Sequence, residues 1–438
     1  MQHSITIVPR YDPPRLISTT RARSLLTAVD PALWVLAGIG FVAQVGIAVM
    51  LPLLPLFATQ LGASPFVLGL LTSAFAITNG IGQLGTGFLA ERWGSRRLMT
   101  GGVAAYATMN ALIASAATAG WLLLWRSLAG FGGGAMIVAE RIYVTEVTDR
   151  SRRAFANGII SAAQSAGTVA GPAVGGLVAA VANLRAPFVL VAVTSSIAFV
   201  GTLFLRRPLP RAAAPRPEDA TQATASVGRL AYGAIGVLLL ANLALNAGFG
   251  GFITTYAPLA TARLGWSTLD VGIAFSFFGA GSILLGPALA HLADRIGRRP
   301  VAIASALPVA AFGTALYLEA AQPVVLAVGF AAGGGLTAFT SSWYALLADV
   351  SDERRRGRIF GVVSAISNSG IVVGALLAAQ LWERVDIGLA MLSSSISVLV
   401  AGAVLLTFQA PQQGPEAGPE AGPEAGREPE AGAPIIGS

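Results

Sequence analysis

The 438-residue chain is 54% hydrophobic and 11% charged, and its mean hydropathy is +0.70. Soluble domains carry about 25% charged residues, so this chain could not cover a globular surface with polar groups, and lipid is its expected solvent. The absence of cysteine excludes a disulfide framework and a thiolate metal site. The net charge of +7 is compatible with nucleic acid, but the arginines fall between apolar runs, so we expect no nucleic-acid partner.

The chain begins with a polar arm. Residues 1–29 hold four arginines and no long apolar run. The first apolar run, at about residues 31–58, is too long for the apolar core of a signal peptide. We therefore expect an uncleaved N-terminal arm.

Twelve apolar runs follow. A segment that crosses a bilayer must satisfy its own backbone hydrogen bonds, so all twelve are predicted to be transmembrane helices and the fold class an all-α membrane protein. The helices are expected at about residues 31–58, 64–90, 98–118, 121–146, 154–181, 186–205, 230–258, 266–293, 300–320, 323–347, 357–382 and 386–408.

The arginines indicate how these helices are oriented. With the N-terminus in the cytoplasm, 23 arginines fall on cytoplasmic segments and only three, Arg185, Arg263 and Arg384, fall on outer loops. Positive charge is concentrated on the cytoplasmic side of membrane proteins. We therefore expect a multi-pass protein of the cell membrane with both termini in the cytoplasm.

Composition divides the chain into five parts. Residues 206–228 are rich in proline and alanine and are predicted to be a cytoplasmic linker between two six-helix halves. After about residue 408 the sequence repeats Gly-Pro-Glu-Ala, which cannot bury enough apolar surface to fold. The predicted parts are an arm (1–29), an N-terminal half (30–205), the linker (206–228), a C-terminal half (229–408) and a disordered tail (409–438).

The two halves are internal repeats. Residues 87–97 read GFLAERWGSRR and residues 290–300 read AHLADRIGRRP, with equivalent positions always 203 residues apart. The same spacing relates Gly69 to Gly272 and Ser73 to Ser276. Since six helices per half is an even number, both halves cross the membrane in the same direction. Such parallel repeats place a substrate site between the halves at the midplane.

These features resemble the major facilitator superfamily over about residues 30–408. The first loop is similar to the family pattern G-x-L-A-D-R-x-G-R-R, with Glu91 in place of aspartate and Ser95 in place of a basic residue; in the second copy Ala290 replaces the leading glycine. In the family, this loop and a segment after the fourth helix form a cytoplasmic gate. The resemblance implies such a gate from Gly87, Glu91, Arg92, Gly94, Arg96, Glu146, Arg153, Asp294, Arg295, Gly297, Arg299, Asp349 and Arg356.

A glycine-rich stretch in the fifth predicted helix resembles the antiporter motif G-x8-G-x3-G-P-x2-G-G. Every fixed position is present: Gly158, Gly167, Gly171, Pro172, Gly175 and Gly176. Small residues spaced by four allow helices to approach closely, and proline kinks a helix. The motif implies membership of the 12-span drug:proton antiporter group, whereas the alternative is ordinary close packing of small residues.

Two charged residues in the fourth predicted helix are candidates for the transport pathway. Arg126 and Gly130 resemble the family's R-x-x-x-G motif, which is implicated there in proton coupling. Glu140 lies about 21 Å further along the helix and about 40° around it, so both side chains can face one cavity. For Glu140 the alternative is a gate salt bridge near the cytoplasmic rim.

Polar residues in several other helices are predicted to line the cavity. Asn and Gln are also recruited for hydrogen bonds between membrane helices, and that alternative stays open for each of them. The candidates are Gln44, Asn79, Gln83, Gln164, Asn242, Asn246, Tyr256 and Asn368.

Together these features predict a secondary transporter that works by alternating access. Its expected action is proton-coupled efflux of a small hydrophobic or amphiphilic compound, by a monomer in the lipid bilayer. Facilitated diffusion or uptake of a metabolite or lipid is the alternative, and a non-transporting receptor or membrane enzyme is a second one. No nucleophile–base group, phosphate-binding loop or metal-ligand cluster is present in the sequence, so we expect no enzyme activity and no cofactor.

Overall fold

A computed structural model describes residues 31–148, 153–206, 229–351 and 356–409. The predicted arm, and all but the first residue of the predicted linker and tail, lie outside the described residues. The described part of the chain holds thirteen helices. They are α2 (Pro31–Gln60), α3 (Pro65–Trp93), α4 (Ser95–Ala114), α5 (Ala119–Val147), α6 (Arg153–Val181), α7 (Ala186–Leu203), α8 (Arg229–Ala262), α9 (Thr268–Leu284), α10 (Gly286–Ile296), α11 (Arg298–Tyr317), α12 (Gln322–Asp349), α13 (Arg356–Arg384) and α14 (Ile387–Leu405).

One predicted helix is broken. The segment expected to be continuous over about residues 266–293 bends by 42° between α9 and α10. The break falls just before Pro287, which lacks a backbone N–H and whose ring clashes with the carbonyl four residues earlier. Because α9 and α10 together correspond to one bent span, the thirteen described helices correspond to the twelve predicted spans.

The helices have the length and composition of membrane spans. Eight of the described helices are long and apolar enough to cross a bilayer, and the bent α9–α10 pair makes nine. The helices α4, α13 and α6 are not among them, and α6 is rich in glycine and alanine. Its small side chains pack instead against other helices, as described below.

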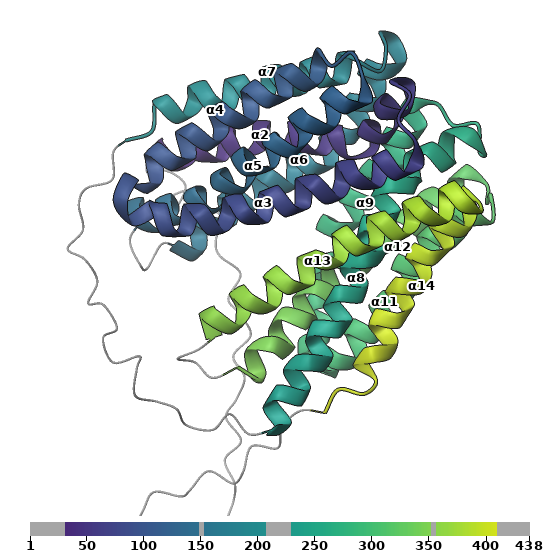
Figure 1. Cartoon of the computed structure of the whole chain (residues 1–438). Helices are drawn as coiled ribbons and strands as arrows, with labels where there is room; N and C mark the ends of the chain where they lie inside the picture. The colour runs from purple at the N-terminus through teal and green to yellow at the C-terminus, as the bar shows by residue number, and fades with distance from the viewer. Residues whose placement is uncertain (1–30, 149–152, 207–228, 352–355, 410–438) are drawn as a thin grey trace, which may run out of the picture.

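The helices form two groups of the same design (Figure 1). In the first group α2 packs on α6 and α7, α3 on α5, and α4 on α5 and α7. In the second group α8 packs on α13 and α14, α9 and α10 on α12, and α11 on α12 and α14. Each pair in one group has its counterpart in the other, so the fold consists of two parallel six-helix repeats.

The turns repeat as well. Gly94, between α3 and α4, has φ 78°, and Gly297, between α10 and α11, has φ 103°. A second pair, Gly62 and Gly265, has φ 80° and 67°. Glycine adopts positive φ without a steric penalty from Cβ, so it allows each sharp reversal at these loops.

Candidate functional site

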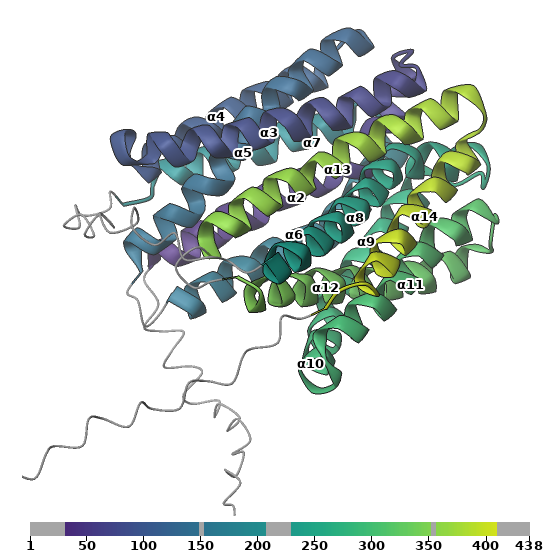
Figure 2. The same cartoon turned by 60° about the horizontal axis from the view of Figure 1, so that its bottom comes forward.

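The two halves meet at one end of the molecule. We call it the closed end; it holds the loops α2–α3, α6–α7, α8–α9 and α13–α14. The opposite end, where α7 finishes and α8 starts, is the linker end. The halves approach each other at the closed end and diverge toward the linker end (Figure 1). The main contacts between them are α3 on α13 and α6 on α9, and Figure 2 shows α13 running beside α3 and α8.

The α6–α9 contact is close enough to require glycine. A Cβ on Gly272 would lie 2.2 Å from the carbonyl oxygen of Pro172, and one on Gly176 would lie 2.4 Å from the carbonyl oxygen of Thr268. Two hydrogen bonds join the helices here: Ala173 N–H donates to the Ser276 hydroxyl at 3.0 Å, and the Thr268 hydroxyl donates to the Gly176 carbonyl at 3.2 Å.

Pro172 lies at this contact, next to the Ala173 N–H. Proline within a helix distorts the local pattern of backbone hydrogen bonds because it lacks an N–H and its ring displaces the preceding turn. The structure keeps α6 continuous through Pro172. The Ala173 N–H, which follows Pro172 directly, donates to a partner in the other half.

The α3–α13 contact repeats this geometry. A Cβ on Gly69 would lie 2.7 Å from Cβ of Ala379 and 2.9 Å from the Ala375 carbonyl oxygen. The Ser73 hydroxyl donates to the Val372 carbonyl at 3.2 Å. The spacing of 203 residues that relates Gly69 to Gly272 also relates Pro172 to Ala375 and Gly176 to Ala379. The closed end is therefore built from two equivalent contacts.

A cavity of about 200 Å³ lies between the halves. Its wall is formed by α2, α5, α8 and the middle turns of α3 and α13. Most of this wall is apolar. Its lining residues are Leu51, Leu54, Pro55, Thr72, Phe75, Ala76, Asn79, Gly80, Arg126, Phe249, Gly250, Ile253, Asn368 and Ile371. No aspartate or glutamate is among them.

Arg126 is the charged residue of this cavity. Its side chain is buried, with 7% of its surface exposed. One guanidinium nitrogen lies 2.8 Å from the Met50 sulfur, the guanidinium carbon lies 3.7 Å from the centre of the Phe75 ring, and the Tyr106 side chain also interacts with it. The Nε–H has no hydrogen-bond partner among the described residues.

These contacts offset the cost of the buried charge without a carboxylate among the described lining residues. A charge inside a membrane helix costs about 2.5–3.5 kcal/mol on insertion scales. A desolvated cation over an aromatic ring regains about 2 kcal/mol, and thioether sulfur is a weak acceptor. Arg126 is therefore held in place without a counter-charge from the described lining of the cavity.

The other predicted cavity residues separate into two groups. Asn79 and Asn368 line the cavity together with Arg126. The others are not part of its lining and have partners elsewhere. Gln83 donates to Asn79 at 2.7 Å, and Asn246 donates to Asn242 at 3.2 Å. The Tyr256 hydroxyl donates to the Val271 carbonyl at 2.8 Å, Gln44 packs near Gly167, and Gln164 donates to Glu140.

Glu140 lies in a separate environment between α5 and α6. Its carboxylate is partly buried and accepts hydrogen bonds from the Gln164 amide at 3.1 and 3.3 Å. It is closer to the linker end than Arg126 and does not line the central cavity. A partly buried carboxylate with an amide partner can take up and release a proton without breaking an ion pair among the described residues.

The glycines of the antiporter-like motif have different neighbours. A Cβ on Gly167, Gly171 or Gly175 would come within 2.7–2.8 Å of α2. Gly176 faces α9 in the other half, whereas a Cβ on Gly158 would meet nothing within 4 Å. Close packing therefore accounts for four of the glycines but not for Gly158.

The predicted gate residues lie at the linker end, and their described contacts stay within one half. Ser95 donates to Glu146, and Arg298 donates to Asp349 at 2.5 and 2.6 Å. Arg96 binds the Leu203 carbonyl and Arg299 binds the Leu406 carbonyl, again 203 residues apart. Arg92, Asp294 and Arg295 are exposed, and Gly87 is exposed on α3. The side chains of Glu91, Arg153 and Arg356 lie outside the described part of the chain.

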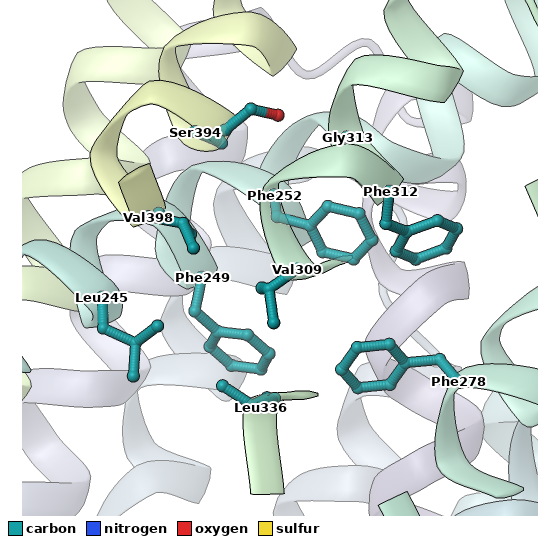
Figure 3. Close-up of a pocket in the computed structure, with 12 residues that line it drawn as sticks. Leu245, Phe249, Phe252, Phe278, Val309, Phe312, Gly313, Leu336, Ser394 and Val398 are labelled. Atoms are coloured by element: carbon teal, nitrogen blue, oxygen red, sulfur yellow. The ribbon is translucent and has the colours of Figure 1, made fainter. Parts of the chain in front are cut away.

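A second, smaller pocket lies inside the C-terminal half. It has a volume of about 40 Å³, and Figure 3 shows aromatic rings and aliphatic side chains pointing into it. Phe249, Phe252, Phe278 and Phe312 belong to its wall, and Phe249 also lines the central cavity. Sequence reasoning missed this pocket. The available signal was the spacing of three residues between Phe249 and Phe252 and between Phe275 and Phe278, which places each pair on one helix face.

Two parallel six-helix repeats that close on each other at one end and enclose a mid-depth cavity define the architecture of a secondary transporter. The sequence profile of the Major Facilitator Superfamily matches residues 36–267 and 238–436, and the chain belongs to this superfamily. It is accordingly a membrane transporter and not an enzyme.

Relatives named for drug resistance or drug efflux are similar to this chain along most of its length. Tetracycline resistance protein, class C, of Escherichia coli is 27% identical over 377 residues, covering 80% of this chain and 89% of that protein. The multi-drug resistance efflux pump PmrA homolog of Lactococcus lactis is 24% identical over 365 residues, covering 81% and 88%. The resemblance to the drug:proton antiporter group is thereby confirmed.

Solved structures confirm the fold. The nucleoside transporter NupG has a TM-score of 0.72 at 14% identity, covering 86% of this chain and 99% of that one. A bacterial homolog of the human lysosomal transporter Spinster, in an inward-facing and occupied conformation, has a TM-score of 0.69 at 16% identity, covering 88% and 96%. At these identities the likeness concerns the fold alone.

Proposed function

We propose that the chain exports a small hydrophobic or amphiphilic compound from the cytoplasm in exchange for protons, by alternating access. The observation that carries the proposal is the largely apolar cavity between two repeats whose main described contacts lie at one end. One sequence relative is named as a multi-drug resistance efflux pump homolog, which supports efflux, and another is named for tetracycline resistance. The transporter would act as a monomer in the bilayer.

The distribution of arginine supports placing the linker end in the cytoplasm. In that orientation the conformation described here is inward-facing, and the cavity receives its substrate from the cytoplasm. When the linker end closes, its charged residues would move toward the opposite half. Their contacts with that half would hold this end closed. Both termini, the linker and the tail would be cytoplasmic.

We assign proton coupling to α5. Glu140 would carry the proton, because its carboxylate is partly buried and its described hydrogen-bond partner is an amide. Arg126 would contact the substrate in the cavity. Arg126→Ala is expected to abolish transport while the protein still reaches the membrane; retained transport would give Arg126 a structural role.

Everted membrane vesicles test the proposal. With an acidic interior, proton efflux through the transporter should drive accumulation of substrate, and collapse of the pH gradient should release it. A broad panel of hydrophobic compounds that shows no response to the gradient would contradict proton-coupled efflux.

Facilitated or uptake transport is the second candidate. It is favoured by the absence of a carboxylate from the described lining of the cavity. Structural neighbours also include a D-xylose-proton symporter and a nucleoside transporter. Substrate counterflow without proton movement would support this candidate over proton-coupled efflux.

A further inference from the structure

The central cavity carries a positive charge and no described negative one. Arg126 is the charged side chain in its wall, and the other polar lining residues are Thr72, Asn79 and Asn368. Amide and hydroxyl groups can donate hydrogen bonds to an anion. The wall is therefore suited to an anionic group rather than to a cation.

The surroundings of Arg126 leave part of its binding capacity unused. Its described contacts are a sulfur atom, an aromatic face and a phenol, and its Nε–H has no partner. A guanidinium binds carboxylates through two parallel N–H donors, and such charge-assisted bonds are about twice as strong as neutral ones. A carboxylate entering the cavity would supply the acceptor that the protein does not.

The apolar part of such a ligand has a wall to lie against. Phe249 lines both the central cavity and the aromatic pocket of the C-terminal half. Behind it, Phe252, Phe278 and Phe312 surround the pocket, and Val309 points into it (Figure 3).

We propose that the transported compound is an amphiphilic organic anion. Its anionic group binds Arg126, and its apolar part lies along Phe249 and reaches the aromatic pocket. This substrate class rests on the proposed transport function. The same chemistry is presented by a dissolved organic acid and by an anionic lipid headgroup, and the experiment distinguishes these two sources.

The experiment measures ligand binding without a pH gradient. The full chain is reconstituted in phosphatidylcholine nanodiscs, and its thermal unfolding is followed with octanoate, octanol and octylamine, which share one chain length and differ in charge. A ligand that binds the folded state raises the unfolding temperature. Octanoate is expected to stabilise the protein most and octylamine least.

Variants locate the binding site. Arg126→Gln is expected to weaken octanoate binding by about tenfold or more, the loss of one charge-assisted hydrogen bond, and to leave octanol binding unchanged. Arg126→Lys, which keeps the charge without the planar donor pair, should retain a preference for octanoate over octylamine. Decanoate should bind more tightly than octanoate, and Val309→Phe, which fills the pocket, should remove that difference.

Each outcome decides a part of the proposal. Equal stabilisation by octylamine and octanoate, or full octanoate binding by Arg126→Gln, would overturn the anion site. A chain-length preference that survives Val309→Phe would overturn the role of the pocket. Loss of the octanoate response in nanodiscs that contain phosphatidylglycerol would identify a lipid headgroup as the occupant, and an unchanged response would identify a dissolved acid. Because no proton gradient is present, failure of coupled transport in vesicles leaves this result unaffected.

Discussion

Replacing Gly272 by alanine should open the closed end. This residue lies on α9 where it crosses α6, and the added Cβ would lie 2.2 Å from the carbonyl oxygen of Pro172 and 3.2 Å from Cα of Gly176. Ordinary contacts to a Cβ begin at 3.4 Å. Both obstructing groups are backbone atoms, so no side-chain rotation can relieve the clash and the two helices must separate.

The size of the effect follows from the geometry. The helices must move apart by about 1.2 Å, the difference between 3.4 and 2.2 Å. Overpacking of a tight contact costs about 1–3 kcal/mol. Because the α6–α9 contact belongs to the conformation closed at this end, the cost falls on that conformation. Its population relative to the alternative should decrease about 5- to 150-fold.

A single introduced cysteine can report this change, because the chain has none of its own. Ala76 lines the central cavity, and Ala76→Cys can be labelled with a membrane-impermeant maleimide in everted and right-side-out vesicles. We expect the native background to be labelled from the linker side and Gly272→Ala to shift labelling toward the opposite side. Gly158→Ala, at a position on α6 with nothing within 4 Å, is the matched control and should change nothing.

An unchanged labelling pattern in folded Gly272→Ala would refute this reasoning. It would mean that the α6–α9 contact either yields without cost or persists in both conformations. A similar shift in Gly158→Ala would show that the response is not specific to the contact between the halves.

Three further outcomes are expected. Gly69→Ala should shift labelling in the same direction but less, because its nearest obstruction at 2.7 Å is a Cβ and not a backbone oxygen; a larger shift than Gly272→Ala would contradict this order. Glu140→Gln, which keeps an acceptor for the Gln164 amide, should abolish pH-driven accumulation in everted vesicles and retain counterflow, whereas preserved pH-driven accumulation would place coupling elsewhere. Burial alone would raise the pKa of Asp386, but the N–H groups at the start of α14 and the Arg263 guanidinium outweigh it and hold the pKa below the ordinary 3.8. The stabilisation from Asp386 is therefore present at neutral pH and is lost as pH falls through this lowered pKa. Asp386→Asn should lower the unfolding temperature at pH 7 and lower it progressively less as the pH is reduced; a difference that does not shrink in acid would contradict the ion-pair account.

Much of the fold is contained in the hydropathy pattern. A run of apolar residues long enough to cross a bilayer can only be helical, and the spacing of 203 residues reveals the duplication before any contact is known. The break at Leu285 was the exception. Proline in membrane helices is often tolerated, as it is at Pro172, and the sequence does not show which proline interrupts its helix.

The site was less accessible to sequence reasoning. Arg126 was a candidate because a charge within an apolar run is costly to bury in a membrane. The structure places its side chain in the cavity wall. Asn242 and Asn246 are two amide side chains four residues apart, as are Asn79 and Gln83, yet Asn79 lines the cavity and neither Asn242 nor Asn246 does. The rotational setting of each helix is fixed by its neighbours and not by its own residues. For the same reason the hydrogen bond from Ala173 to Ser276 could not be predicted, since it depends on how α6 and α9 cross.

In alternating access the two halves rotate relative to each other about the cavity, so that one end opens as the other closes. Spin labels on exposed positions of the cysteine-free chain measure both ends: Gln60→Cys with Glu383→Cys at the closed end, and Arg97→Cys with Ile296→Cys at the linker end. In liposomes with a transported substrate, we expect the closed-end distance to lengthen in the same fraction of molecules in which the linker-end distance shortens. Distances that change together in one direction, or that stay fixed while substrate is transported, would contradict the claim.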